Sequence, residues 1–142
     1  MKTLFKTILT FSFMIFACSF ANANPNTAAK KSMNYTLTKF IEGSTLGEIA
    51  GLPVLLDEGF KMDINCGSRT FSFNKKQVVD FMKKTKNIVQ NCETNYKIVE
   101  ENGDFTIAKV EMKYPNFTRV NYVTLVNHGF YWSITNVSTT YI

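Results

Sequence analysis

The C-terminal part of the chain constrains the fold most, because turn sequences divide it into four segments of strand length. Each separator contains a residue pair that antiparallel hairpins favour: Asn102-Gly103, Pro115-Asn116 and His128-Gly129. The segments predicted as strands run over residues 88–100, 104–114, 118–127 and 131–140. Their length and short connections predict a four-stranded antiparallel meander.

A shorter hairpin is predicted ahead of the meander. Phe60, Met62 and Ile64 alternate with polar residues, which is the pattern of a half-buried strand. Gly67-Ser68 then turns the chain into a short partner strand.

Two helices are predicted before this hairpin. From Met33 to Ile41 the apolar residues recur at the spacing of an amphipathic helix, and Gly43 supplies a terminator. Thr45 and Glu48 have the spacing of a capping box, which predicts a short second helix.

Polar residues mark the start of two of the helices. Ser32 is a suitable N-cap for the first helix. Asn74 opens a third helix, with Gln77 at the reciprocal capping position. The order of elements predicts an α+β fold, in which three N-terminal helices pack on a curved antiparallel sheet made of the short hairpin plus the four-stranded meander.

The N-terminus has the three parts of a secretory signal peptide. Two lysines precede an apolar run from Ile8 to Phe20, and Ala21-Asn22-Ala23 supplies the small residues of a cleavage site. The run is shorter than the roughly 20 residues that a membrane-spanning helix needs. We therefore predict an exported protein, periplasmic or secreted, without a transmembrane span.

Three regions follow from this interpretation. Residues 1–23 are the predicted signal peptide, residues 24–31 a flexible lead-in and residues 32–142 a single folded domain. Cys18 leaves open a second route, because the residues before it loosely resemble a lipoprotein cleavage box that would give a lipid anchor.

Charge and composition exclude some functions and leave open whether the chain contains a disulfide. The predicted signal removes two of the 16 basic residues and no acidic one, which leaves a net charge of +3. This excess is small, so no nucleic-acid partner is predicted. The single histidine supports no histidine-based metal site, and no cofactor is predicted. Cys66 and Cys92 form either a disulfide or two buried thiols.

A candidate ligand site follows from the expected register of the meander. The more apolar face of the sheet is expected under the helices, and polar groups converge near one end of it. The residues proposed to hold a ligand are Arg119, Asn121, Asn136, Trp132 and Leu125. Arginine presents a planar fork suited to a carboxylate or phosphate. Alternatively, the polar members only satisfy one another.

The mature chain resembles the nuclear transport factor 2-like (NTF2-like) superfamily. It is most similar to the exported bacterial branch that carries the name lumazine-binding. The segments that carry the resemblance are Phe40-Ile41-Glu42-Gly43, Gln90-Asn91-Cys92, Val110-Glu111-Met112-Lys113-Tyr114, Phe117 to Leu125, and Trp132 to Val137. The resemblance implies a cone-shaped fold with a pocket between sheet and helices, and a homodimer through the open sheet face.

Function does not transfer with this fold, because members of the superfamily include isomerases, cyclases, dehydratases and non-catalytic binding modules. Asp63 and Tyr122 are weak catalytic candidates, and His128 is expected in an exposed turn. Three functions remain open. They are a non-catalytic domain that binds an unknown small molecule, a cofactor-free isomerase- or cyclase-like enzyme with an interior carboxylate, and a structural or interaction module with a filled cone.

Overall fold

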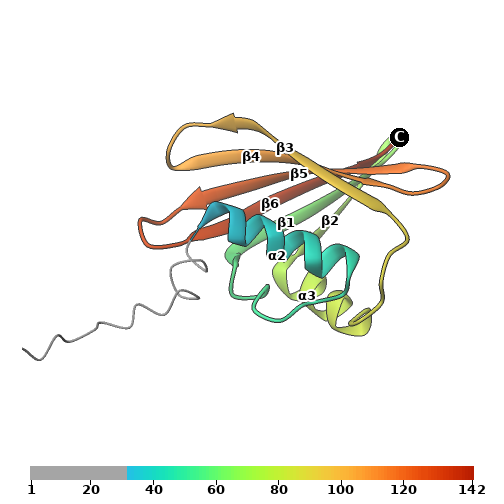
Figure 1. Ribbon diagram of the computed structural model, residues 1–142, viewed down its shortest axis with the longest axis horizontal. Coiled ribbons are helices and arrows are strands. Elements are labelled where there is room, and N and C mark those ends of the chain that lie inside the picture. The colour runs from blue at the N-terminus through green and yellow to red at the C-terminus, as the bar shows by residue number, and fades with distance from the viewer. Residues whose placement is uncertain (1–31) are drawn as a thin grey trace, which may run out of the picture.

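The computed structural model describes residues 32–142, which fold into two helices on one face of a six-stranded sheet (Figure 1). The predicted signal peptide and lead-in lie outside the described residues. The helices are α2 (Met33–Thr45) and α3 (Lys75–Lys84). The strands are β1 (Leu56–Cys66), β2 (Arg69–Asn74), β3 (Glu93–Glu101), β4 (Phe105–Lys113), β5 (Thr118–Asn127) and β6 (Trp132–Tyr141).

The strand order is β2-β1-β6-β5-β4-β3. The predicted hairpin and four-stranded meander are both present, and every neighbouring pair is antiparallel except one. β1 lies parallel to β6, so the sheet is mixed, and the expectation of a purely antiparallel sheet was wrong. This parallel contact is formed by strands from opposite ends of the domain sequence, and no local pattern marks it.

The predicted second helix is absent, and α2 instead continues past Gly43 to Thr45. The hydroxyl of Thr45 donates to the carbonyl of Ile41 at 2.8 Å, so it serves the last turn of α2 and not the start of a new helix. Gly43 is required by packing, since a Cβ atom there would lie 2.5 Å from Leu52 Cδ2. The glycine was therefore misinterpreted as a helix terminator.

The caps of the two observed helices are as predicted. Ser32 accepts a hydrogen bond from the backbone N–H of Tyr35. Asn74 and Gln77 form a complete capping box at the start of α3, with both reciprocal bonds at 3.0 Å. These bonds satisfy N–H groups that the first helical turn leaves without partners.

The core lies between the helices and the inner face of the sheet. β4 alternates between buried and partly exposed positions, and its buried residues Ala108, Val110 and Met112 have no exposed surface. Val123 pairs with Ala108 from β5, which confirms the predicted inner face at this point. The largest fully buried side chains at the centre of the core are Phe40, Phe60, Leu37, Leu52, Met112 and Leu125.

Register shifts curve the sheet. The pairing of β6 with β5 contains a register shift. Leu125 pairs with Ile134, but its neighbour Thr124 pairs with Asn136, so Thr135 is an extra residue in β6. Such a bulge bends the strand and moves the following residues to the opposite face. Neither of the helices among residues 32–142 has the length and apolar character needed to cross a membrane.

Candidate functional site

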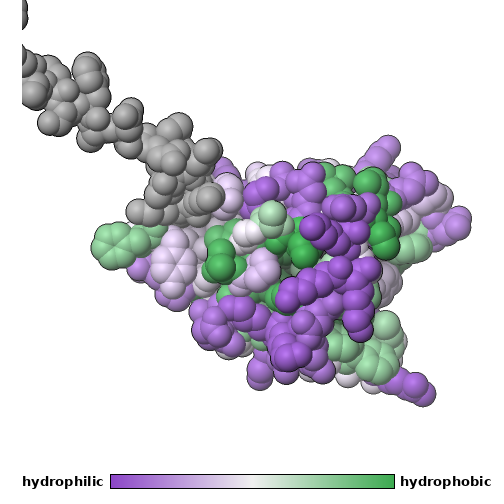
Figure 2. Space-filling model, turned by 90° about the horizontal axis from the view of Figure 1, so that it is seen from below, coloured by the Kyte–Doolittle hydropathy of each residue, from purple (hydrophilic) through white to green (hydrophobic). Residues whose placement is uncertain are grey.

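A cavity of about 600 Å³ opens between α3, the C-terminal end of α2 and the inner face of the sheet. Its walls are mainly apolar, and they are formed by Met62, Ile64, Phe73, Val78, Phe81 and Met82. Viewed from the helix side, Figure 2 shows apolar surface at the centre of this face with hydrophilic side chains around it. The size and the lining are those of a small-molecule site, for which volumes of roughly 300–1,000 Å³ are usual.

Arg119 is the basic group that β5 contributes to the cavity. Its Nε donates to Oδ1 of Asn121 at 3.1 Å, which two-residue spacing on one strand face permits. Arg119 forms no ion pair with any residue between 32 and 142. With Nε occupied, the two terminal nitrogens of the guanidinium are the groups left to bind an anion.

Asn121 is fully buried and accepts the hydrogen bond from Arg119 on the core side of the arginine. Its Oδ1 also accepts from the hydroxyl of Thr139 at 2.9 Å, and its Nδ2 contacts the sulfur of Met112 at 3.7 Å. Both ends of the amide therefore have partners, which fixes its orientation and, through it, the orientation of the arginine.

Ser44 lies in the last turn of α2 and also lines the cavity. Its Oγ is buried and has no hydrogen-bond partner among the described residues. A buried hydroxyl without a partner is unfavourable by about 1–3 kcal/mol. Because the oxygen itself has almost no accessible surface, a ligand in the cavity would reach it only after the Ser44 side chain moves.

Aromatic residues gather beside the cavity at the end of β6. Tyr141 lines the cavity, and its ring lies 5.9 Å from that of Phe117, which stacks on Tyr114 at 4.5 Å. The hydroxyl of Tyr114 donates to Gln90, another lining residue, at 3.3 Å. Burial raises the pKa of Tyr114, and the nearby thiol of Cys92 adds to the increase.

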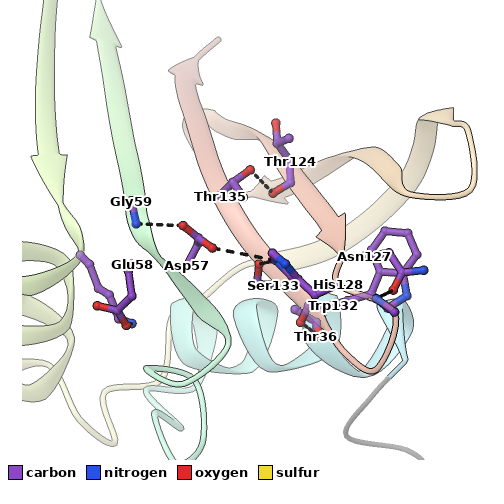
Figure 3. Close-up of polar contacts among 12 residues, drawn as sticks. Thr36, Asp57, Glu58, Gly59, Thr124, Asn127, His128, Trp132, Ser133 and Thr135 are labelled. Carbon is purple, nitrogen blue, oxygen red and sulfur yellow. Dashed lines mark hydrogen bonds and ion pairs between the residues drawn. The ribbon is translucent and has the colours of Figure 1, made fainter.

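The other three predicted ligand residues lie away from this cavity. Leu125 is fully buried in the core, about 20 Å along β5 from Arg119 at the usual rise per residue. Trp132 packs at the same far end, where Thr36 donates to its carbonyl at 3.1 Å (Figure 3). Asn136 faces the opposite side of the sheet, because the bulge at Thr135 reverses the expected alternation.

No protein-family model matches the chain, and none of the curated proteins matches it. Solved structures do match. An NTF2-like protein of unknown function from Silicibacter pomeroyi is 11% identical, with a TM-score of 0.64 over 77% of this chain and 92% of its own. An NTF2-like protein from Cytophaga hutchinsonii is 16% identical, with a TM-score of 0.60 over 75% of this chain and 93% of its own.

The chain has the NTF2-like fold. A protein of unknown function from Pectobacterium atrosepticum gives a similar result, with 13% identity and a TM-score of 0.60 over 82% of this chain and 91% of its own. At these identities the likeness concerns the fold alone, so the narrower resemblance to the lumazine-binding branch stays a prediction. We refer to the end of the domain that holds the cavity as the wide end of the cone, and to the end at Trp132 as the narrow end.

The weak catalytic candidates lie outside the cone. Asp63 accepts from Ser72 at 2.5 Å and from Asn136 at 3.4 Å, both on the outer face. Tyr122 is 40% exposed on the same face and pairs across the sheet with Ser138, which in turn pairs with Asp63. The carboxylate that lines the cavity is Asp80, and it is ion-paired with Lys76 at 2.6 Å.

His128 also has polar neighbours, which Figure 3 shows at the narrow end. Its Nε2 lies 2.8 Å from Ser133 Oγ and 3.9 Å from Asp57 Oδ2. In a Ser-His-Asp triad the serine and the carboxylate contact different ring nitrogens, whereas here both contact Nε2. The group therefore lacks the geometry of a nucleophile with an oriented base.

The two cysteines are free thiols on distant strands. Cys66 ends β1 and Cys92 immediately precedes β3, with β6, β5 and β4 between them. Four strand spacings amount to about 19 Å across the sheet, whereas a disulfide needs Cα atoms within about 7 Å. The disulfide alternative was wrong, and the thiols are unpaired. Among residues 32–142 no group of three acidic, histidine or cysteine side chains is arranged to hold a metal ion.

Sequence reasoning missed several cavity residues. Ser44, Gln90 and Tyr141 come from α2, the segment before β3 and the end of β6, and only the packing of distant segments brings them together. The alternation of β5 did predict that Arg119 and Asn121 share a face, because that spacing is local.

Proposed function

We propose that this domain is a non-catalytic binding module that holds a small anionic molecule in the wide end of the cone. The observation that carries the proposal is a mainly apolar cavity of about 600 Å³ that contains a guanidinium without an ion-pair partner among residues 32–142. The ligand is expected to carry a carboxylate or phosphate for the terminal nitrogens of Arg119 and an apolar body for the walls.

The orphan hydroxyl of Ser44 supports the same proposal. A side chain that is unfavourable for stability is retained at the wall of the cavity, which is expected where a group serves binding. A change of the Ser44 rotamer toward the cavity would let a ligand oxygen accept the hydrogen bond that the protein leaves unmade.

The two alternatives have less support. An enzyme with an interior carboxylate would need a base inside the cone, but Asp63 lies on the outer face and Asp80 is held by Lys76. A cone filled by its own side chains would leave no cavity, whereas a cavity is present and Phe81 at its wall is 65% exposed.

Export and dimerisation belong to the proposal as well. We expect the signal peptide to direct the domain to the periplasm or the medium. We expect a homodimer through the outer sheet face, which carries Tyr122 and the ion pair between Lys109 and Glu111. Substitution of Tyr122 by Asp is expected to convert a dimer to a monomer in light scattering, and a wild-type protein that is already monomeric would refute this part.

Native mass spectrometry of gently purified, exported protein tests ligand binding. We expect an excess mass that is lost on denaturation and is absent from Arg119→Ala. Arg69→Ala removes the other arginine of the chain, which is exposed on β2, and should retain the ligand. An excess mass that survives in Arg119→Ala would contradict the assignment of the anchor.

Ser44→Ala gives a second and independent test. Because Ser44 Oγ makes no hydrogen bond, its removal should leave stability equal or higher while weakening ligand retention. Thr106→Val is the matched control, since Thr106 Oγ1 is also buried without a partner but lies outside the cavity. The control should gain stability without losing ligand, and equal ligand loss in both variants would indicate a general effect on the fold.

A further inference from the structure

Apolar side chains protrude from the end of α3 and the segment that follows it. Phe81, Ile88 and Val89 are 65%, 51% and 69% exposed. Isolated exposed apolar residues are ordinary on protein surfaces, but these three lie within nine residues of sequence.

Unpaired lysines lie among these apolar residues. Residues 81–92 contain Lys83, Lys84 and Lys86 and no acidic residue, and the acidic residues that flank them are Asp80 and Glu93. The ion pair with Lys76 lowers the pKa of Asp80, and the charges of Lys83 and Lys84 add to the decrease. Lys83, Lys84 and Lys86 form no ion pair with a described residue. By contrast, the lysines at the start of α3 are neutralised, since Lys75 binds Glu58 and Lys76 binds Asp80, each at 2.6 Å.

Backbone hydrogen bonds hold this segment in place. The N–H of Ile88 donates to the carbonyl of Thr85 at 3.1 Å, and Asn87 and Gln90 donate to the backbone of the α2 end at 3.1 and 2.6 Å. The apolar side chains are therefore carried by a backbone that these three hydrogen bonds anchor to the rest of the domain.

We propose that the α3 exit surface, made of Phe81, Lys83, Lys84, Lys86, Ile88 and Val89, binds the surface of an anionic phospholipid bilayer. The apolar side chains would enter the headgroup boundary while the ammonium groups contact lipid phosphates. Lysines beside protruding apolar residues match this environment. An acidic protein partner would match the charge, but it offers the exposed apolar side chains no defined pocket.

The α3 exit surface lies next to the cavity, because Phe81 and Lys84 line both. The proposal nevertheless stands apart from ligand binding in the cone, since Lys83, Lys86, Ile88 and Val89 do not line the cavity. Variants at these four positions therefore test the membrane surface without altering the proposed ligand site.

Vesicle co-sedimentation of the mature protein tests the proposal, with phosphatidylglycerol–phosphatidylcholine vesicles compared with pure phosphatidylcholine. We expect binding to the anionic vesicles that weakens as salt is added. The double variant Lys83→Gln/Lys86→Gln should bind at least tenfold more weakly, given the usual contribution of each lysine near a charged bilayer. Ile88→Ser/Val89→Ser should also lose most of the binding, at unchanged net charge.

Lys97→Gln/Lys113→Gln is the matched control, because it removes the same charge from β3 and β4 on the far side of the sheet. This control should keep wild-type binding. The proposal is overturned if the anionic vesicles do not bind the protein, if pure phosphatidylcholine binds it equally well, or if the control loses as much binding as Lys83→Gln/Lys86→Gln. Binding to polyglutamate but not to vesicles would favour an acidic protein partner and also overturn it.

Discussion

Replacement of Asn121 by leucine would separate the stabilising role of this amide from its proposed role in orienting Arg119. The side chain is fully buried, and its Oδ1 accepts one hydrogen bond from Arg119 Nε at 3.1 Å and another from Thr139 Oγ1 at 2.9 Å. Leucine has the same branching but cannot accept either bond. The variant therefore leaves one buried hydroxyl and one partly exposed guanidinium N–H without a partner.

The expected cost follows from these two bonds. A buried hydroxyl without a partner costs about 1–3 kcal/mol, and Thr139 has no exposed surface through which water could replace the lost acceptor. Arg119 is only partly buried and can regain water, so its lost bond is expected to cost about 0.5–1 kcal/mol. Asn121→Leu should therefore lower the free energy of unfolding by about 1.5–4 kcal/mol.

Thr139→Val supplies the decisive comparison. Valine replaces the hydroxyl by a methyl group, so in Asn121→Leu/Thr139→Val neither partner of that bond remains. The double variant should be about 1–2 kcal/mol more stable than Asn121→Leu alone, which is a non-additivity that a double-mutant cycle measures. Urea unfolding followed by the fluorescence of the single tryptophan gives these values.

Two results would refute this reasoning. A cost of Asn121→Leu below about 0.5 kcal/mol would mean that the amide does not anchor the network. Strictly additive effects of the two substitutions would mean that Thr139 and Asn121 are not coupled. Ligand retention adds a separate readout, because Thr139→Val alone should keep the ligand while Asn121→Leu should lose it.

Three further predictions concern single features. Gly47→Ala should lower the free energy of unfolding, measured in urea, by about 2 kcal/mol or more beyond the effect of Gly67→Ala. Both glycines have a positive φ, 67° at Gly47 and 60° at Gly67. A Cβ atom at Gly47 would lie 2.5–2.8 Å from backbone atoms, whereas a Cβ atom at Gly67 would have no atom within 4 Å. Equal costs would contradict this. Because burial raises the pKa of Tyr114, the stability that its protonated form contributes is present below about pH 10 and is lost as the pH rises through the raised pKa. The difference between ultraviolet titrations of the wild type and of Tyr114→Phe should place the ionisation of Tyr114 above about pH 10, and an ionisation at or below that pH would contradict this. Cys66 and Cys92 should both react with a thiol reagent in protein purified without reductant, and fewer than two reactive thiols in the mature chain would contradict the structure.

Most strands were predictable from the sequence because their signals are local. Alternation with a period of two and turn pairs between segments depend on neighbours along the chain, and so do the caps at Ser32 and Asn74. The second helix was mispredicted for the opposite reason. Gly43 is a glycine because Leu52 packs against it, and a tertiary contact of this kind leaves no mark that distinguishes it from a helix terminator.

The candidate site was predictable only along a single strand. Arg119 and Asn121 were placed together correctly because side chains two residues apart on a strand point to the same face. Asn136 was placed on the wrong face because the extra residue Thr135 shifts the register. The sequence of β6 is rich in β-branched residues and contains no local pattern that predicts the bulge. The contributions of α2 and α3 to the cavity depend on how the helices meet the sheet, which periodicity does not specify.

The two ends of the cone differ in a way that bears on function. At the narrow end Thr36 donates a hydrogen bond to the carbonyl of Trp132, although the hydroxyl of Thr106, which pairs with Leu125, is buried there without a partner among the described residues. At the wide end the protein leaves an open apolar volume, an orphan hydroxyl at Ser44 and a guanidinium held only through its Nε. Filling this volume and pairing these groups would stabilise the fold by ordinary means. An orphan hydroxyl is not by itself a mark of binding, because Thr106 has one outside the cavity. What distinguishes the wide end is that the open volume and the guanidinium of Arg119 occur together there, which is where a ligand would meet them.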